Sequence, residues 1–545
     1  MIDRIIEVLL ILLLVFTPIA FGSQELWAFS LMELGILLII ILWAVGRLSN
    51  QSLVTRSMTD NQSLVTSNRP RITNNHVLIT TVLLSLFLGI VVLQMIPLPS
   101  GAVRIISPKT YDIRHQLSVK STGLSYQSSV HSSDDKLRIT NNESPATDNG
   151  SLITNPQSPI TNNRSLVTTL SLFPMGTKIE FLKWLTLAGL FTFLLRWGLS
   201  DGGYRKTNRL IIAIFLVGVF ESLYGMVEFF SGHRHILNLD WSAWISSVTG
   251  TFVNRNYFAG YLLMVIPLSI GFLFSREANQ SGRFRGWRHW LSSLDGKMLL
   301  LGFGLILMIL GLLLSASRMG ILSLLISFSL ICLFFRDPRR GRGVSRIPIL
   351  IFGLALLWAI WIGLDAVIGR FFTVSEDLKS RWMLWGNTLR ILKDFPFLGS
   401  GLGSFTQVFP MYRSFHIRGL ITHAENDFLQ LASEVGLCGA GLLLVLFLFL
   451  FYRAASGIRL LTSREPQKYV GIGCLVGILA LMFHSFVERN VQVPANAFLF
   501  TVMWAMALRI GGGVRGGREM KKVKVEVKAE VEWWRNIGEV EGEAE

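Results

Sequence analysis

Cysteine and charge are both scarce in this chain. It has 3 cysteines in 545 residues, and Cys332, Cys438 and Cys474 each lie inside an apolar run with no partner at the spacing of a metal site. We therefore expect neither a disulfide framework nor a zinc site. Only 16% of the residues are charged, whereas 51% are hydrophobic and the mean hydropathy is +0.49. This composition argues against a string of soluble domains and for a membrane protein.

Apolar runs with the length of a bilayer core recur along the whole chain. We therefore predict an all-α fold, a polytopic integral membrane helical bundle of about 12 transmembrane helices. The first run is expected to be a retained helix and not a cleaved signal, because a second run follows at once. The predicted spans cover residues 5–22, 27–46, 77–97, 178–197, 208–230, 257–275, 298–315, 319–335, 348–368, 431–452, 469–487 and 497–511.

The net charge of +16 does not indicate nucleic-acid binding, because the Lys and Arg residues cluster in short loops between the apolar runs. That distribution is typical of cytoplasmic loops. With both termini in the cytoplasm, the basic loops fall on the cytoplasmic side. Loops 231–256, 316–318, 369–430 and 488–496 then fall on the outer side.

Two Ser-, Thr- and Asn-rich stretches look like insertions. Near-copies recur in them, such as Gln51-Ser-Leu-Val-Thr55 and Gln62-Ser-Leu-Val-Thr66. These stretches are too polar to bury a core, so we expect disorder. The predicted organisation is transmembrane helices 1 and 2 (1–50), a repeat insert (51–75), helix 3 with an outer loop (76–115), a second repeat insert (116–168), helices 4 to 9 (175–368), a long extracytoplasmic loop between helices 9 and 10 that holds the catalytic residues (369–430), helices 10 to 12 (431–511) and a charged cytoplasmic tail (512–545).

A dense polar run, residues 422–436, stands directly against an apolar segment. Thr422 and Glu425 have the spacing of a capping box, which predicts a helix that begins at His423. A helix N-terminus disfavours the imidazolium, so His423 would stay neutral and could act as a general base. The plain alternative is a hydrogen-bonded helix end at the interface. The residues expected on one face of this helix are His423, Asn426, Asp427, Gln430 and Glu434.

Two arginines on the predicted outer side run against the usual charge bias and indicate an anion. Arg318 lies in a tight turn, and Arg381 stands one helical turn before Trp385. The alternatives are a structural carboxylate partner for Arg318, such as Glu228 or Glu488, and an interfacial aromatic belt for the tryptophan. Gly399 to Gly403 resembles a phosphate loop only superficially, and a flexible turn is the preferred interpretation.

Two further polar groups are expected to support the site. Asn254, Arg255 and Asn256 stand at the outer mouth of the sixth span. The second group lies between the last two spans and contains His484, Glu488, Arg489, Pro494 and Asn496. His484 and Glu488 are one turn apart and could bond to each other, or could close the bundle as a structural pair.

Taken together, these runs resemble the O-antigen ligase and polymerase family of bacterial membrane enzymes, which move glycans linked to lipid diphosphates. The resemblance rests on Gly250-Thr-Phe-Val-Asn-Arg-Asn-Tyr-Phe-Ala-Gly260, Ser317-Arg-Met-Gly320, Arg381 with Trp385, Pro396 to Phe405, His423 to Gly436, and His484 to Glu488 followed by Pro494. The family often has a second His where this chain has Glu425, and Asp where it has Glu488.

The resemblance implies a metal-independent glycosyltransferase without cofactors in the bacterial cytoplasmic membrane. Arg318 and Arg381 would hold the diphosphate of a polyprenyl-linked glycan donor, and His423 would activate the acceptor hydroxyl. The acceptor could be lipid A-core in lipopolysaccharide, another glycan repeat, a protein Ser or Thr, or a secondary wall polymer. The outer loops hold no Asp-x-Asp metal motif.

Two other functions stay open from the sequence. A transporter of a small solute, such as inorganic carbon, would fit twelve spans, with Glu221 as the main polar candidate at depth. A non-catalytic scaffold for polysaccharide assembly is the other alternative.

Overall fold

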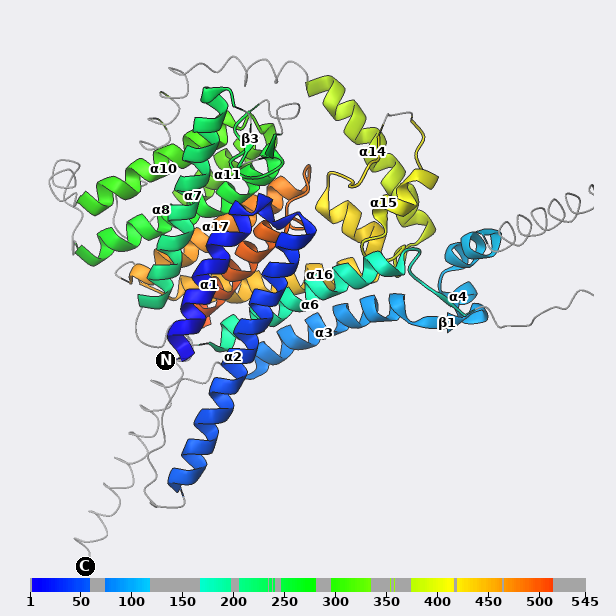
Figure 1. The fold of residues 1–545 in the computed structure, drawn as a ribbon, viewed down its shortest axis with the longest axis horizontal. Helices are drawn as coiled ribbons and strands as arrows, with labels where there is room; N and C mark the ends of the chain where they lie inside the picture. Colours follow the sequence, from blue (N-terminus) through cyan, green and yellow to red (C-terminus); the bar gives the residue numbers. More distant parts are fainter. Residues whose placement is uncertain are drawn as a thin grey trace, which may run out of the picture.

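The computed structural model describes residues 2–58, 74–117, 167–197, 205–233, 235–237, 239–240, 247–280, 296–334, 353, 357, 374–415, 419–462 and 465–512. Within these ranges the chain is an all-α membrane bundle, as predicted (Figure 1). Among the described residues, eight helices are long and apolar enough to cross a membrane. The strands in this part of the chain form two small antiparallel pairs, β1 with β2 and β3 with β4.

The elements follow one another in this order: α1 (Ile2–Ile19), η1 (Phe21–Ser23), α2 (Leu26–Met58), α3 (Asn74–Met95), β1 (Pro97–Pro99), α4 (Ser100–Ile106), β2 (Val167–Thr169), α6 (Pro174–Arg196), α7 (Arg205–Ser231), β3 (His235–Ile236), β4 (Leu239–Asp240), α8 (Arg255–Gln280), α10 (Gly296–Leu314), α11 (Arg318–Phe334), α14 (Val374–Asp394), α15 (Phe405–Val408), η3 (Phe409–Met411), α16 (Asp427–Arg459) and α17 (Pro466–Ser485). A last helix covers Pro494–Gly512.

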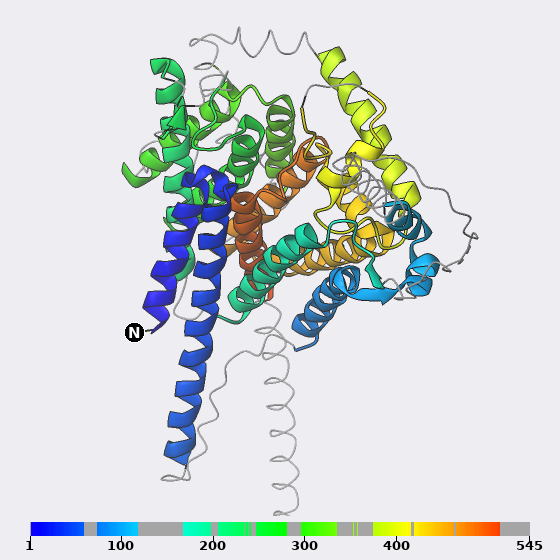
Figure 2. The ribbon, with the colours of Figure 1, turned by 45° about the vertical axis from the view of Figure 1, so that its right-hand side comes forward.

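Eleven of the twelve predicted spans coincide with one of these helices. The span predicted at 348–368, most of the two repeat inserts and the tail after Gly512 lie outside the described residues. The helix α2 runs on to Met58, beyond the boundary predicted for the first insert (Figure 2). Helix α11 is an apolar helix slightly shorter than the spans. The total of about 12 spans therefore stays a prediction.

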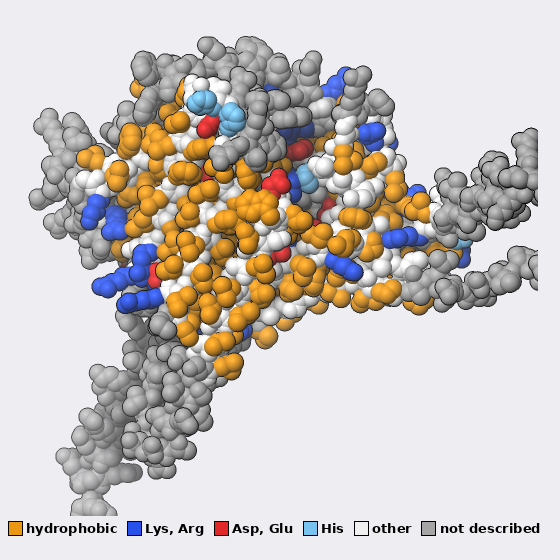
Figure 3. Space-filling view, in the orientation of Figure 1, with side chains coloured by type: hydrophobic (Ala, Val, Ile, Leu, Met, Phe, Trp, Pro, Cys, Tyr) orange, Lys and Arg blue, Asp and Glu red, His pale blue; other side chains and the backbone are white. Residues whose placement is uncertain are grey.

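Helix α8 is the centre of the bundle, because its membrane window is wholly buried by other helices. It packs against α17 at backbone distance. A Cβ on Gly473 would lie 2.6 Å from the Pro267 carbonyl oxygen, and one on Gly271 would lie 2.4 Å from that of Tyr469. Small residues at such positions let membrane helices approach closely. The outward faces, such as that of α2 with exposed Leu34 and Leu37, are apolar (Figure 3).

The two ends of the bundle carry different groups. At the end where the chain begins, Lys206 lies 4.0 Å from Asp3, and Arg209 pairs with Glu7 at 2.7 Å. At the same end the Arg509 guanidinium donates to the Leu195 carbonyl at 2.8 Å. The segments around β3, α14 and α15 lie at the other end (Figure 1). Lys206 and Arg209, which were assigned to the cytoplasmic side, therefore lie at the end of the bundle that holds the N-terminus.

Helix α16 is broken at Gly436, where the backbone has φ 68° and ψ 179°. The break is filled by the loop that follows α14, because Leu437 N donates to the Pro396 carbonyl at 2.8 Å and Cys438 N donates to that of Phe397 at 3.2 Å. A Cβ on Gly436 would lie 2.1 Å from the Phe397 carbonyl oxygen. The sequence predicted one uninterrupted span here, so the break is a finding of the structure.

Replacing Gly436 by alanine is therefore expected to destabilise the protein by at least about 2 kcal/mol, because only glycine adopts this backbone conformation at low cost. Gly441→Ala is the matched control, since it lies in the same helix and a Cβ there meets nothing within 4 Å. Thermal unfolding in detergent measures both. Equal melting temperatures for the two variants would show that the break at Gly436 is not required.

Candidate functional site

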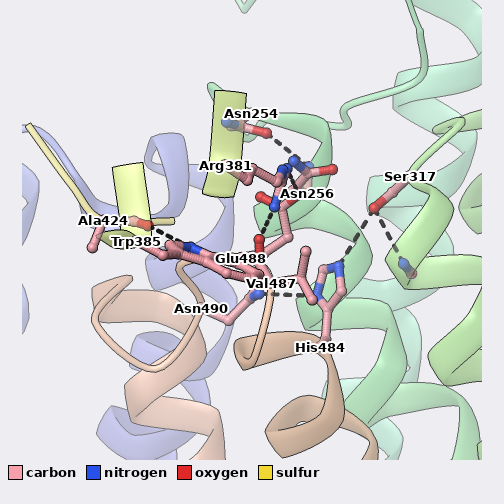
Figure 4. A network of polar contacts seen from close by, with 11 residues as sticks. Asn254, Asn256, Ser317, Arg381, Trp385, Ala424, His484, Val487, Glu488 and Asn490 are labelled. Carbon is pink, nitrogen blue, oxygen red and sulfur yellow. Dashed lines mark hydrogen bonds and ion pairs between the residues drawn. The ribbon is translucent and has the colours of Figure 1, made fainter. Parts of the chain in front are cut away.

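The long loop region that was predicted as extracytoplasmic has its own small core. Ile391 on α14, Phe405 on α15 and Phe409 pack with Ala424, and each is at most 2% exposed. This packing fixes the segment that carries His423 against α14. The Trp385 indole completes the attachment, because its Nε1 donates to the Ala424 carbonyl at 3.1 Å (Figure 4). The tryptophan thus positions the segment before α16, which the aromatic-belt interpretation did not anticipate.

Arg381, one turn before Trp385, points to the turn between α17 and the last helix. Its guanidinium pairs with the Glu488 carboxylate and donates to the Val487 carbonyl (Figure 4). Glu488 is only 4% exposed. A buried carboxylate of this kind needs a cationic partner. Glu488, which the sequence offered as a partner for Arg318, is thus the partner of Arg381.

His423 lies in the segment before α16 and is partly buried. The helix predicted to begin there is wrong: α16 begins at Asp427, and its N-cap is Asn426, whose Oδ1 accepts from Leu429 N at 3.0 Å. Glu425 has a positive φ of 49°, which no capping box tolerates. Asn426 competes successfully for the cap because its short side chain reaches the free amides of the first turn.

The His423 imidazole contacts a cation from the polar group around His484 and Glu488. Arg489 Nη1 bonds to His423 Nε2. Burial and the nearby charges of Arg489 and Lys183 lower the pKa of His423 to about 2. The imidazole is therefore neutral, as predicted, but the cause is burial beside cations and not a helix N-terminus.

Glu425 and Glu488 form a carboxyl pair between the two arginines. Burial, with the Glu488 charge next, raises the pKa of Glu425 to about 7, while Arg381 and Arg489 oppose the rise. Burial also raises the pKa of Glu488. Two neighbouring carboxyls in a poorly hydrated site favour holding one proton between them.

This pair predicts a pH-dependent stability. A carboxyl whose folded pKa is raised binds more protons in the folded state, so stability is lost as the pH rises from about 4.5 through about 7. Glu425→Gln is expected to flatten that decline. Melting temperatures in detergent at pH 5 and pH 8 measure it, and an unchanged pH dependence in the variant would rule out Glu425 as the source.

The polar face of α16 fastens three separate segments to the helix. Asp427 Oδ2 accepts from Asn490 N at 2.7 Å and from Val491 N at 2.8 Å. Gln430 accepts from Ala424 N at 3.0 Å and donates to Glu434 at 3.2 Å. Of the five residues predicted on one helical face, Asp427, Gln430 and Glu434 lie within the helix, and they serve as a scaffold.

Glu434 explains the glycine-rich run from Gly399 to Gly403. Its carboxylate accepts from Gly403 N at 2.9 Å and from Phe405 N at 3.3 Å. Gln94 on α3 secures the same loop, because it accepts from Leu402 N at 3.0 Å. The amides that a phosphate loop would offer to a nucleotide are thus used by a buried carboxylate. The run is a turn, as predicted, but it is fixed in place by these bonds and not flexible.

Asn254 and Asn256 belong to the same cluster through the start of α8. Asn254 Oδ1 accepts from Asn256 N at 2.8 Å (Figure 4). The Asn256 side chain bonds to Glu488. Arg255 is the first residue of α8 and is partly buried.

His484 does not use its ring to bond to Glu488, so that prediction is wrong. Its Nδ1 bonds to the Asn490 amide at 2.9 Å, and its Nε2 bonds to the Ser317 hydroxyl at 3.4 Å (Figure 4). Ser317 immediately precedes Arg318, the first residue of α11. Through this chain of bonds the turn that carries Arg318 joins the turn that carries Glu488 and Arg489. The role of Arg318 toward a substrate stays a prediction.

Two charged residues near His423 have a signal in the sequence. Arg489 is a positive charge in a short loop on the predicted outer side, the same anomaly that drew attention to Arg318. Lys183 is a lysine inside a predicted span, is only 5% exposed, and pairs with Glu180 at 2.5 Å. Ionisable residues in spans are functional candidates by default. Their closeness to His423, by contrast, could not be read from spacing.

An apolar cavity of about 720 Å³ lies beside this cluster. It follows α16 from Asp427 to Leu450 and is also lined by Phe428, Lys183 and Gln492. Phe447 and Trp504 line it farther along. The cavity therefore joins a polar end next to the site with a long apolar part.

These features define a multi-pass membrane protein with an ionisable site at one end of its bundle. A family model described as O-antigen ligase matches residues 303–444, the stretch that contains Arg318, Arg381 and His423. Over these residues the chain is similar to the O-antigen ligase family, and this similarity supports glycan transfer of the ligase or polymerase type. A search among curated proteins finds no match.

The transport alternative finds no support. Glu221, its main candidate at depth, is fully buried and accepts from Thr251 N at 2.8 Å and Thr251 Oγ1 at 2.7 Å. Its carboxylate fastens the turn before α8 and is therefore occupied as a structural acceptor.

Proposed function

We propose that this protein transfers a glycan from a polyprenyl diphosphate to an acceptor hydroxyl at the outer face of the bacterial cytoplasmic membrane. The observation that carries the proposal is the joint position of the neutral His423 imidazole and the Arg381 and Arg489 guanidiniums around one buried carboxyl pair. The apolar cavity beside them supports it, because a polyprenyl chain needs such a channel next to its charged head group.

The proposed reaction uses one general base and two cationic side chains that hold the diphosphate. The acceptor oxygen attacks the anomeric carbon and its proton passes to His423, while the bond from that carbon to the phosphate oxygen breaks. The electron pair of this bond leaves with the polyprenyl diphosphate. Arg318 and Arg381 stabilise the growing negative charge, because a guanidinium offers paired donors to phosphate. Catalysis needs no cofactor in this scheme.

The test uses purified protein, a labelled lipid-linked glycan and a hydroxyl acceptor. Wild type is expected to transfer the label, and alanine variants at Arg318, Arg381 and His423 are expected to fail while keeping the elution profile of the folded protein. Normal transfer by all three variants would refute the proposal. Uptake of labelled solute into vesicles without glycan transfer would favour a carrier.

Metal independence is a separate prediction of the same scheme. Fixed guanidiniums can neutralise a diphosphate without a divalent cation. Transfer is therefore expected to keep its rate when a chelator such as EDTA is present at millimolar concentration. A loss that added Mg²⁺ or Mn²⁺ restores would show that a metal shares the diphosphate.

A further inference from the structure

Resting on the proposed function, we infer that Arg489 locks His423 in the donor-free protein, and that a bound diphosphate draws Arg489 away and so releases the base. The contact behind this inference joins Arg489 Nη1 to His423 Nε2. A guanidinium nitrogen only donates, so Nε2 must be the accepting nitrogen. Nδ1 then carries the ring proton. In this state neither ring nitrogen has a lone pair for an acceptor hydroxyl.

The other ring nitrogen completes the argument. Within the described residues His423 Nδ1 is buried and has no hydrogen-bond partner. A base that is oriented for constant use commonly has its second nitrogen held by an acceptor. His423 is held instead from its accepting side, which is the arrangement of a blocked base.

Arg489 itself is placed to respond to an anion. The Arg489 Nε is also buried without a partner, and the guanidinium lies 6.0 Å from the centre of the Tyr257 ring. Its turn is anchored at the next residue, because Asn490 N donates to Asp427 at 2.7 Å. The backbone is thus fixed while the side chain keeps unused donor capacity. A diphosphate offers several charged acceptors and competes strongly for a guanidinium.

The consequence is an order of events. Donor binding moves the Arg489 guanidinium from the imidazole to the phosphates. His423 Nε2 is then free to accept a proton, and the charge next to the ring changes from positive to negative. Both changes favour transfer of the acceptor proton to His423 at the moment that the glycan moves. Acceptor hydroxyls, including water, meet an inactive base until the donor is present.

The experiment follows carbethoxylation of His423 by diethyl pyrocarbonate, a reagent that attacks the unprotonated ring nitrogen, with peptide mapping by mass spectrometry. Inorganic pyrophosphate serves as the diphosphate probe. Wild type is expected to react slowly alone and at least about tenfold faster with pyrophosphate. Arg489→Met keeps the apolar stem but has no donors, and it is expected to react fast under both conditions. Arg489→Ala is the second variant if the Met variant does not fold.

Two histidines give internal references. His233 is exposed and should react fast throughout, whereas His484 is buried with both ring nitrogens bonded and should stay slow. Equal rates for wild type and the Arg489 variant without pyrophosphate would overturn the lock. So would an unchanged or slower wild-type rate when pyrophosphate is added.

The readout does not depend on glycan transfer. A protein that shows the pyrophosphate response but transfers no glycan would keep the lock and reject the proposed function. A protein that transfers glycan without the response would keep the function and reject the lock.

Discussion

His423→Ala is expected to lower the rate of glycan transfer by at least about a hundredfold, which is the usual contribution of a positioned general base. The reason is that the attacking hydroxyl would lose its proton acceptor, while the guanidiniums around the diphosphate stay in place. The binding of the donor should therefore change little. Initial rates with a labelled lipid-linked glycan, together with a donor-binding measurement, test both statements.

His233→Ala is the matched control for this variant, because it removes an exposed imidazole from a loop just before β3. Its transfer rate should equal that of wild type. A His423→Ala protein that folds, binds donor and still transfers at a wild-type rate would remove the imidazole from the mechanism.

Arg381→Gln is expected to cost both stability and activity. The Glu488 carboxylate would remain buried without its main cationic partner. Removing one member of a buried pair typically costs about 3–5 kcal/mol. Transfer should fall by at least about a hundredfold, because a fixed donor to the developing phosphate charge is lost. Melting temperature and transfer rate are measured on the same sample.

The double variant Arg381→Gln with Glu488→Gln separates the two effects. Stability should return toward wild type, because no buried charge is left unpaired, whereas transfer should stay low. Arg390→Gln on the exposed face of the same helix controls for the loss of a positive charge. A double variant that transfers normally would mean that Arg381 only neutralises Glu488.

The membrane helices were predictable because their signal is local. A run such as residues 257–275 is apolar over its whole length, and the structure contains α8 over Arg255–Gln280. The break in α16 was not predictable, because Gly436 looks like an ordinary glycine in an apolar run. The helix breaks there because the amides of the two residues after Gly436 donate to the carbonyl groups of Pro396 and Phe397, which lie some 40 residues earlier in the chain.

The site shows the same difference between local signals, which the sequence reveals, and contacts between distant residues, which it does not. Its residue types were predictable, because a histidine, carboxylates and arginines beside apolar runs are costly unless they are used. Their pairing was not. His423 bonds to Arg489 across 66 positions, and Arg381 bonds to Glu488 across 107. The capping-box prediction failed for a local reason, because Asn426 is an equally good N-cap and the backbone at Glu425 turns left-handed.

The most direct test of the account is the amount of polyprenyl diphosphate released for each glycan transferred by the purified protein. One diphosphate per glycan is expected for wild type, and neither product above background is expected for His423→Ala. Release of a monophosphate, or undiminished release by that variant, would contradict a diphosphate leaving group assisted by this imidazole.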